Sequence, residues 1–280
     1  MKPIVKWVGG KRQLLDQINE NIPRTKFNIY HEAFLGGGAV LIDLKPQKAK
    51  VNDLNKDLIN VYEVVKNKPK ELIKILKKHQ KNNTSEYFYQ IRALDRNEYT
   101  FSLMNKIHKA ARILYLNKTC YNGLYRVNSN GHYNTPYGRY VNPNIVDEEN
   151  ILKLSDYLNN NDIEIYSDDF KIFLNQISKG DFVYLDPPYD SEENIESFTS
   201  YQSNGFTREN QLELKNKCDE LHKKGAYFLL SNADTKYIRE IYKDYYIIEV
   251  FAKRYVNCKG DKRGAVKELL IRNYKVYENE

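Results

Sequence analysis

The chain has 280 residues, of which 41% are hydrophobic, and a formal net charge of +7. It contains no run of 18 or more apolar residues and no signal-peptide stretch at its start, so we expect no membrane span and a cytoplasmic location. Its three cysteines, Cys120, Cys218 and Cys258, form neither a CxxC metal motif nor an even-numbered disulfide framework, so we expect no zinc site.

The first half of the chain opens with strands around a glycine turn and continues as helices. Around residues 29–53, the segments NIYHEAF, LGGGAVLIDL and AKVNDL predict strand, turn, short helix and strand. From Lys56 to Asn97 the apolar spacing is helical, and Pro69 stands where a helix begins. Another helix is predicted for 103–118, followed by a polar loop over 119–144 that is rich in glycine and asparagine.

The second half of the chain alternates strands with helices. Strands are predicted for 162–166, 181–186, 226–232, 245–252 and 267–274. Helices are predicted for 168–177, 208–224 and 235–244. Because no helix separates the last two strands, we expect one of them to run antiparallel. The whole pattern predicts an α/β sheet with helices on its faces, interrupted by a helical insertion of about 100 residues.

The loop region has an unusual charge distribution. From Tyr99 to Val146 there is no Asp or Glu, although about six would be expected at the average frequency of the chain. The window contains seven tyrosines and six basic residues: Lys106, Lys109, Arg112, Lys118, Arg126 and Arg139. This composition suits a surface that meets phosphates and base edges. A tyrosine-rich solvated face explains the window equally well.

The glycine turn at residues 36–38 follows a predicted strand and opens a helix. Glycines at such a place allow a ligand to approach the backbone closely. Neither nucleotide motif fits in detail, because a dinucleotide fingerprint would need glycine in place of Leu41 and a P-loop would need Ser or Thr in place of Arg12. Asp53 ends the next strand and can accept both ribose hydroxyls of an adenosine ligand, so adenosyl binding is favoured over a purely structural turn.

The tetrapeptide Asp186-Pro187-Pro188-Tyr189 follows the apolar strand FVYL. Adenine's exocyclic amine is a poor nucleophile, and a site that activates it needs hydrogen-bond acceptors without competing donors. Asp186 supplies a carboxylate, and the two prolines supply carbonyl oxygens without an N–H of their own. Tyr189 offers a flat face for an extruded base. The chain also lacks a Pro-Cys dipeptide, which argues against methylation of a cytosine carbon.

With these motifs in order, the chain resembles the Dam-type (alpha group) DNA adenine-N6 methyltransferases. The resemblance covers nearly the whole chain and rests on KWVGGKRQLL, AFLGGGA, VNDLN, YNGLYRVNSNGHYNTPYGRY, DFVYLDPPY and FTSY. It implies S-adenosylmethionine (SAM) as cofactor and a Rossmann-like, mixed seven-stranded sheet. On this basis residues 1–55 and 160–280 form the catalytic SAM-binding domain, and residues 56–159 form a helical target-recognition insertion.

The resemblance also implies a role for individual residues. The cofactor-binding residues would be Trp7, Lys11, Phe34, Gly36, Gly38, Asp53, Asp168 and Asp186. Asp168 is assigned loosely, because Asp169 is adjacent. The catalytic residues would be Asp186, Pro187, Pro188 and Tyr189. The DNA-binding residues would be Tyr121, Asn122, Leu124, Arg126, Pro136 and Arg139, with Arg126 reading a guanine and GATC as the target.

Direct, in-line methyl transfer to a flipped adenine is therefore the expected reaction, without a metal or a covalent enzyme intermediate. An RNA adenine methyltransferase is the alternative within enzymes, and the long basic recognition insertion argues against it. A SAM-binding regulator would have no use for an acceptor-only pocket, and an oxidoreductase is disfavoured by Leu41. Expected partners are double-stranded DNA and a separate restriction endonuclease, with the protein itself a monomer or weak dimer.

Overall fold

The computed structural model describes residues 1–191, 206–253 and 265–276. The strands are β1 (Tyr30–Glu32), β2 (Lys48–Asn52), β3 (Asp162–Tyr166), β4 (Phe182–Leu185), β5 (Tyr227–Ala233), β6 (Tyr246–Lys253) and β7 (Ala265–Arg272). The α-helices are α1 (Leu15–Glu20), α2 (Ala39–Leu44), α3 (Lys56–Asn67), α4 (Pro69–Lys81), α5 (Ser85–Ala93), α6 (Glu98–Leu103), α7 (Lys106–Thr119), α8 (Glu148–Asn160), α9 (Phe170–Asn175), α10 (Arg208–Lys224) and α11 (Lys236–Ile241). Short 3₁₀ turns are η1 (Lys11–Gln13), η2 (Leu94–Arg96) and η3 (Tyr121–Gly123).

The strands of the described segments form one mixed sheet of seven, in the order β3-β2-β1-β4-β5-β7-β6. β1 pairs in parallel with β2 and β4, and β4 pairs in parallel with β5. β7 is antiparallel to β5 and to β6. The predicted α/β class and the antiparallel strand near the end of the chain are therefore confirmed.

β4 is the strand that leads into the DPPY tetrapeptide. All four of its side chains are buried, as expected for a strand covered on both faces. It is flanked on each side by a parallel strand, β1 on one side and β5 on the other. Its carboxyl end therefore lies at the edge where open parallel sheets bind their ligands.

The chain divides into two compact units, and each unit combines separate segments. The first contains Met1–Gly10, Gly36–Gln47 and Asn55–Ser167. The second contains Lys11–Leu35, Lys48–Leu54 and the described residues from Asp168 onward. The predicted division into a catalytic domain (1–55 and 160–280) and an insertion (56–159) stays a prediction.

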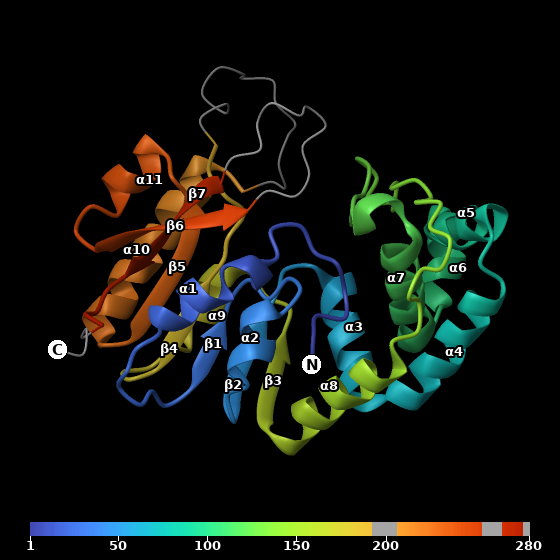
Figure 1. The fold of residues 1–280 in the computed structure, drawn as a ribbon, viewed down its shortest axis with the longest axis horizontal. Coiled ribbons are helices and arrows are strands. Elements are labelled where there is room, and N and C mark those ends of the chain that lie inside the picture. Colours follow the sequence, from blue (N-terminus) through green and yellow to red (C-terminus); the bar gives the residue numbers. More distant parts are fainter. Residues whose placement is uncertain (192–205, 254–264, 277–280) are drawn as a thin grey trace. The chain divides into compact units, whose positions relative to one another are not determined.

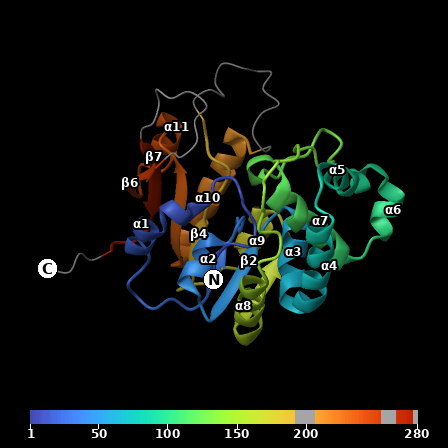
Figure 2. The same cartoon turned by 45° about the vertical axis from the view of Figure 1, so that its right-hand side comes forward.

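Helices dominate the first unit. α3, α4 and α7 lie side by side, and α8 packs against α3 and α4 (Figures 1 and 2). α7 is the central member, with most of its residues from Ala110 onward buried. Its start differs from the predicted 103–118, because α6 ends at Leu103 and the side chain of Asn105 caps a new helix by accepting from the backbone N–H of His108.

Three helices were not anticipated from the sequence: α1, α6 and α8. α8 buries Ile151, Leu154 and Leu158 at the helical spacing of three and four, with Glu148 in its first turn. The signal was therefore present, in a helix of 13 residues that begins soon after the polar loop. α1 has only six residues, and no side chain caps its start.

In the second unit α10 packs along β5 (Figure 1). The helix begins with a capping box, in which Thr207 and Asn210 each accept from the other's backbone N–H. It ends at Gly225, whose φ of 80° is the left-handed conformation that glycine adopts without strain. No helix among the described residues is both long and apolar enough to cross a membrane.

Candidate functional site

The carboxylate of Asp186 lies in an ion pair at the end of β4. Its Oδ1 atom is 2.9 Å from Nζ of Lys11, and the two side chains are 19% and 6% exposed. Burial raises the pKa of Asp186 to about 6, the Lys11 ammonium opposes this rise, and the carboxylate of Glu268 adds to it. At neutral pH the group is therefore an ionised acceptor in a largely dry setting.

Tyr189 is fixed by two charged neighbours. Nζ of Lys11 lies 4.6 Å from the centre of its ring, a cation–π contact. The phenol donates a hydrogen bond of 2.6 Å to Oε2 of Glu268 on β7. Burial, together with the nearby carboxylates of Asp186 and Glu268, raises the pKa of Tyr189 well above its usual range, so the phenol stays neutral. Lys11 thus contacts both ends of the tetrapeptide.

The proline segment is held from behind by two amide side chains. Nε2 of Gln211, near the start of α10, donates a 2.9 Å hydrogen bond to the carbonyl of Pro188. Oε1 of Gln211 accepts in turn from Nδ2 of Asn232 on β5, at 3.0 Å. The Oδ1 atom of Asn232 accepts from the backbone N–H of Asp190. These linked hydrogen bonds of Gln211 and Asn232 hold the backbone at Pro188 and Asp190, next to Tyr189.

The buried carboxylate of Asp190 holds the end of the same loop by contacting Arg208 and Thr235. Nε and Nη2 of Arg208 lie 3.1 and 3.2 Å from its two oxygens, and Oγ1 of Thr235 donates to Oδ2 at 2.7 Å. Sequence reasoning did not identify Asp190, Gln211, Asn232 or Glu268. A buried Asp directly after DPPY, and the polar SNADT segment at the end of a buried strand, were the available signals.

The glycine turn of the first unit is shaped around Trp7. Gly36 and Gly38 have φ of 50° and 64°, which other residues adopt only with strain. A Cβ added at Gly36 would meet Cδ1 of Trp7 at 3.0 Å, so the indole packs directly on the turn. The same indole stacks on Tyr125 with ring centres 5.2 Å apart. Trp7, Gly36 and Gly38, three of the predicted cofactor residues, thus belong to one local structure.

The acidic cofactor candidates of the second unit flank Asn52. Its Nδ2 donates to the carbonyl of Asp168, and its Oδ1 accepts from the backbone N–H of the same residue. Asp53 follows directly on this residue. The side chain of Asp168 is exposed, whereas that of Asp169 accepts from the backbone N–H of Lys171 and caps α9. Of the two adjacent carboxylates, Asp168 is therefore the more exposed, and Asp169 serves as a helix cap.

Phe34 is the remaining cofactor candidate in this unit. Its ring is half-buried and packs against Phe170 and Phe206, with ring centres 5.6 and 5.9 Å apart. The FTSY motif at residues 198–201 lies outside the described residues. Among the predicted site residues of the second unit, Lys11 contacts both Asp186 and Tyr189.

The polar loop of the first unit forms a small hairpin. Val127 and Tyr133 pair across it, and the side chain of Asn128 accepts from two backbone N–H groups of the turn. Arg126 is exposed, and its Nε donates a 2.7 Å hydrogen bond to Oδ1 of Asn134 on the opposite arm.

The other DNA-binding candidates lie at the base of this hairpin. Tyr121 and Pro136 are exposed and adjacent, since the backbone N–H of Tyr121 donates to the carbonyl of Pro136. Asn122 and Arg139 are also exposed, and both have a positive φ, 54° and 55°. Leu124 is half-buried, and its carbonyl accepts from the hydroxyl of Tyr133. All six candidates thus come from one continuous loop, with five of them on the surface.

The acid-free window does not place all of its cations on the surface, and that part of the sequence interpretation is wrong for Arg112. Its side chain is 2% exposed, and Nη2 lies 2.7 Å from Oδ2 of the buried Asp95. Lys118 is half-buried, and burial lowers its pKa to about 8. The basic residues exposed on the loop itself are Arg126 and Arg139.

Comparison with known proteins gives a consistent result over almost the entire chain. Residues 7–256 match the family described as D12 class N6 adenine-specific DNA methyltransferase. A type II methyltransferase of Lactococcus lactis subsp. cremoris, M1.LlaDCHI, is 44% identical over 98% of this chain and 96% of its own length. M.MjaIII of Methanocaldococcus jannaschii, also named a type II methyltransferase, is 40% identical, with 98% and 99% covered. The DNA adenine methylase of Escherichia coli strain K12 is 31% identical, with 96% and 94% covered.

Proposed function

The chain belongs to the D12 class of N6 adenine-specific DNA methyltransferases, and on this premise we propose that Asp186, Pro187 and Tyr189 present the amine of a flipped adenine to the methyl group of SAM. The observation that carries the proposal is the cluster of Lys11, Asp186 and Tyr189 at the carboxyl end of β4. It combines an ionised acceptor and a flat aromatic face in a largely buried setting.

Asp186 and a proline carbonyl align the amine by accepting hydrogen bonds from it, and they do not remove a proton before methyl transfer. The carboxylate of Asp186 accepts one N–H hydrogen, and a proline carbonyl accepts the other. Because Gln211 already donates to the carbonyl of Pro188, we assign the second hydrogen bond to the carbonyl of Pro187. These two bonds align the nitrogen lone pair out of the base plane. As the N–C bond forms, the methyl–sulfur bond would break and S-adenosylhomocysteine would leave, while the proton that the amine loses would pass to the carboxylate of Asp186.

The proposed cofactor fits the residues that are present. The positive φ of Gly36 and Gly38 opens the backbone of the turn to a ligand. Asp53 follows the end of β2, and Asp168 follows the end of its neighbour in the sheet, β3. We assign Gly36, Gly38 and Trp7 to cofactor binding in the first unit, and Lys11, Phe34, Asp53 and Asp168 in the second. SAM supplies a methyl group made electrophilic by its sulfonium sulfur.

For the DNA we propose the exposed loop of the first unit as the reading surface. Tyr121, Asn122, Leu124 and Pro136 contact the target step, Arg126 reads a guanine edge, and Arg139 contacts a phosphate. The resemblance of this loop to Dam-type enzymes favours GATC as the target. Two relatives carry the name type II methyltransferase, which favours a separate restriction endonuclease as a partner.

The test is methyl transfer to plasmid DNA by the whole protein and by Asp186→Ala. We expect the wild type to produce N6-methyladenine and to protect GATC sites from a nuclease that cleaves only unmethylated GATC. Asp186→Ala should lower the transfer rate by at least about 100-fold, while calorimetry shows SAM binding at most weakened. The matched control is Asp16→Ala, an exposed aspartate on α1, which should behave as wild type. Near-normal turnover of Asp186→Ala would remove this carboxylate from the mechanism, and methylation at a different site would refute GATC.

A further inference from the structure

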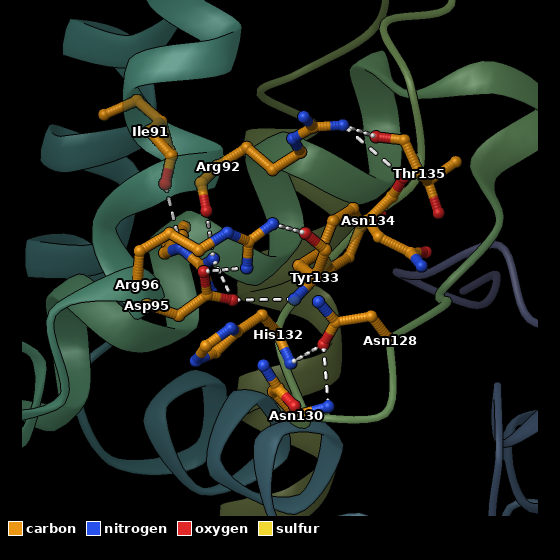
Figure 3. A network of polar contacts seen from close by, with 11 residues as sticks. Ile91, Arg92, Asp95, Arg96, Asn128, Asn130, His132, Tyr133, Asn134 and Thr135 are labelled. Atoms are coloured by element: carbon orange, nitrogen blue, oxygen red, sulfur yellow. Dashed lines mark hydrogen bonds and ion pairs between the residues drawn. The ribbon is translucent and has the colours of Figure 1, made fainter.

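The segment between Lys66 and Asn97 matches no recognised motif, yet its end makes a dense set of contacts with the DNA-reading hairpin. Figure 3 shows these contacts, which join α5 and η2 to the arm formed by residues 133–135. Nη2 of Arg96 donates to the carbonyl of Tyr133 at 2.7 Å. Nη1 of Arg92 donates to the carbonyl of Thr135 at 3.1 Å. The arm is therefore tied down on both sides of Asn134.

Asp95 holds the same arm from within the protein. Its Oδ2 accepts a 2.7 Å hydrogen bond from the backbone N–H of Tyr133, and it also lies 2.7 Å from Nη2 of Arg112. Oδ1 pairs with Nη1 of Arg96, also at 2.7 Å. Arg112 is in turn fixed by donating to the carbonyls of Ile91 and Arg92. Because this carboxylate is buried and fully engaged, it provides a rigid anchor.

The anchored arm determines how Arg126 is presented. The side chain of Asn134 accepts from Nε of Arg126 at 2.7 Å, and the backbone N–H of Asn134 donates to the carbonyl of Arg126. With Nε engaged in the protein, the guanidinium is left with its two terminal nitrogens for a base. These carry a parallel pair of N–H groups that match O6 and N7 of guanine.

We propose that Asn134 is a specificity-determining positioning residue, which holds Arg126 for end-on recognition of guanine and is itself fixed by the Asp95 network. The proposal rests on the proposed function of Arg126. It assigns a role in DNA reading to α5 and η2, whose own residues need not touch the DNA.

The experiment compares kcat/KM on duplexes with the target sequence and with a single change at the guanine that Arg126 reads. Arg126→Ala defines the full effect, an expected loss of about 5- to 150-fold in the ratio of the two values. Asn134→Ala should lose a large part of the same ratio. In the Arg126→Ala background it should lose no more, since the two residues act as one unit.

Asn134→Asp separates positioning from phosphate contact. The carboxylate still accepts from Nε of Arg126, so sequence discrimination should be retained, while binding to all duplexes weakens through repulsion of the phosphates. The matched control is Asn130→Ala, an exposed asparagine at the hairpin tip, which should leave the ratio unchanged. Arg96→Gln removes one tie to the arm while Arg112 still pairs with Asp95, and it should lower the ratio as well.

The outcomes distinguish the two proposals. If Arg126→Ala keeps full discrimination, the proposed guanine-reading role of Arg126 fails. If Arg126→Ala loses discrimination but Asn134→Ala weakens all duplexes equally, Asn134 contacts DNA directly and the positioning role is overturned. If Arg96→Gln keeps the full ratio, the Asp95 network does not fix the arm.

Discussion

Lys11 illustrates how one side chain can serve two partners at the residue scale. Its ammonium is 2.9 Å from the carboxylate of Asp186 and 4.6 Å from the ring centre of Tyr189. It keeps the carboxylate ionised, although burial favours the neutral acid. In the proposed mechanism the amine of adenine needs an acceptor, so the ionised form would be the active one.

Lys11→Met is expected to shift the acid limb of the pH–rate profile to higher pH. The pKa of Asp186 is raised by burial to about 6, and the lysine is the group that opposes the rise. Activity is present above this pKa and is lost as pH falls through it, so removing the ammonium moves the loss upward. Single-turnover methyl transfer between about pH 5 and 9 measures the shift. Lys243→Met, on an exposed lysine, should keep the wild-type profile, and an unmoved acid limb in Lys11→Met would contradict the argument.

Residues that form motifs could be predicted at this scale, whereas their supports could not. Lys11, Asp186 and Tyr189 were all assigned from the sequence, and the structure brings them into contact. Glu268 lies 79 positions from Tyr189, and strand alternation alone gives no indication of which distant group a side chain will meet. Gln211 could not be predicted for the same reason, because its partner Pro188 is distant in the sequence.

At the scale of elements, α10 does more than cover the sheet. Gln211, in its first turn, joins the helix to β5 through Asn232 and to the tetrapeptide through the carbonyl of Pro188. The capping box at Thr207 fixes where the helix begins. It therefore also fixes the position from which Gln211 reaches the carbonyl of Pro188. The loop that we propose to be catalytic is thus tied to a helix terminus.

Gln211→Leu is expected to destabilise the protein by about 1 to 3 kcal/mol, because it leaves the carbonyl of Pro188 and the amide of Asn232 without their partner. It should also lower kcat while leaving SAM affinity nearly unchanged, since the loop is displaced rather than removed. Chemical denaturation and single-turnover rates measure the two effects. Asn216→Leu, on the exposed face of the same helix, is the control. Wild-type stability and rate in Gln211→Leu would show that the amide chain has no such role.

Most strands and helices were predicted from their periodicity, whereas α1, α6 and α8 were missed. The helix at 208–224 and the strands on either side of it were placed closely. The segment predicted as one helix at 103–118 begins instead at Lys106, because capping by Asn105 outweighs continuation of the apolar spacing. α8 shows that an amphipathic helix of 13 residues can be missed when a polar loop precedes it.

For the whole molecule, the location of charge matters more than its sum. The acid-free window supplies six basic residues toward the net +7, but Arg112 is buried with Asp95 and Lys118 is half-buried. Composition cannot tell a cation that stabilises the interior from one that meets DNA. Nor can it show that each compact unit is assembled from separate segments of the chain.

Arg139→Ala is expected to weaken binding to all DNA sequences alike. Loss of one phosphate contact should reduce the slope of log K against log salt by about 0.9 for duplex DNA. Binding titrations at several salt concentrations, with specific and random duplexes, measure this slope. Lys153→Ala, at an exposed lysine of α8 that pairs with Glu149, should leave it unchanged. A loss confined to one sequence would instead make Arg139 a reader of bases.

The ties between α5–η2 and the hairpin address the main chain of residues 133–135 rather than its side chains. The side chains of the hairpin can therefore be exchanged without loss of the contacts that hold its backbone. A graft that keeps Arg92, Asp95 and Arg96 and imports a different hairpin tip should dock in the same register. If the hairpin reads DNA as proposed, target choice would then be modular.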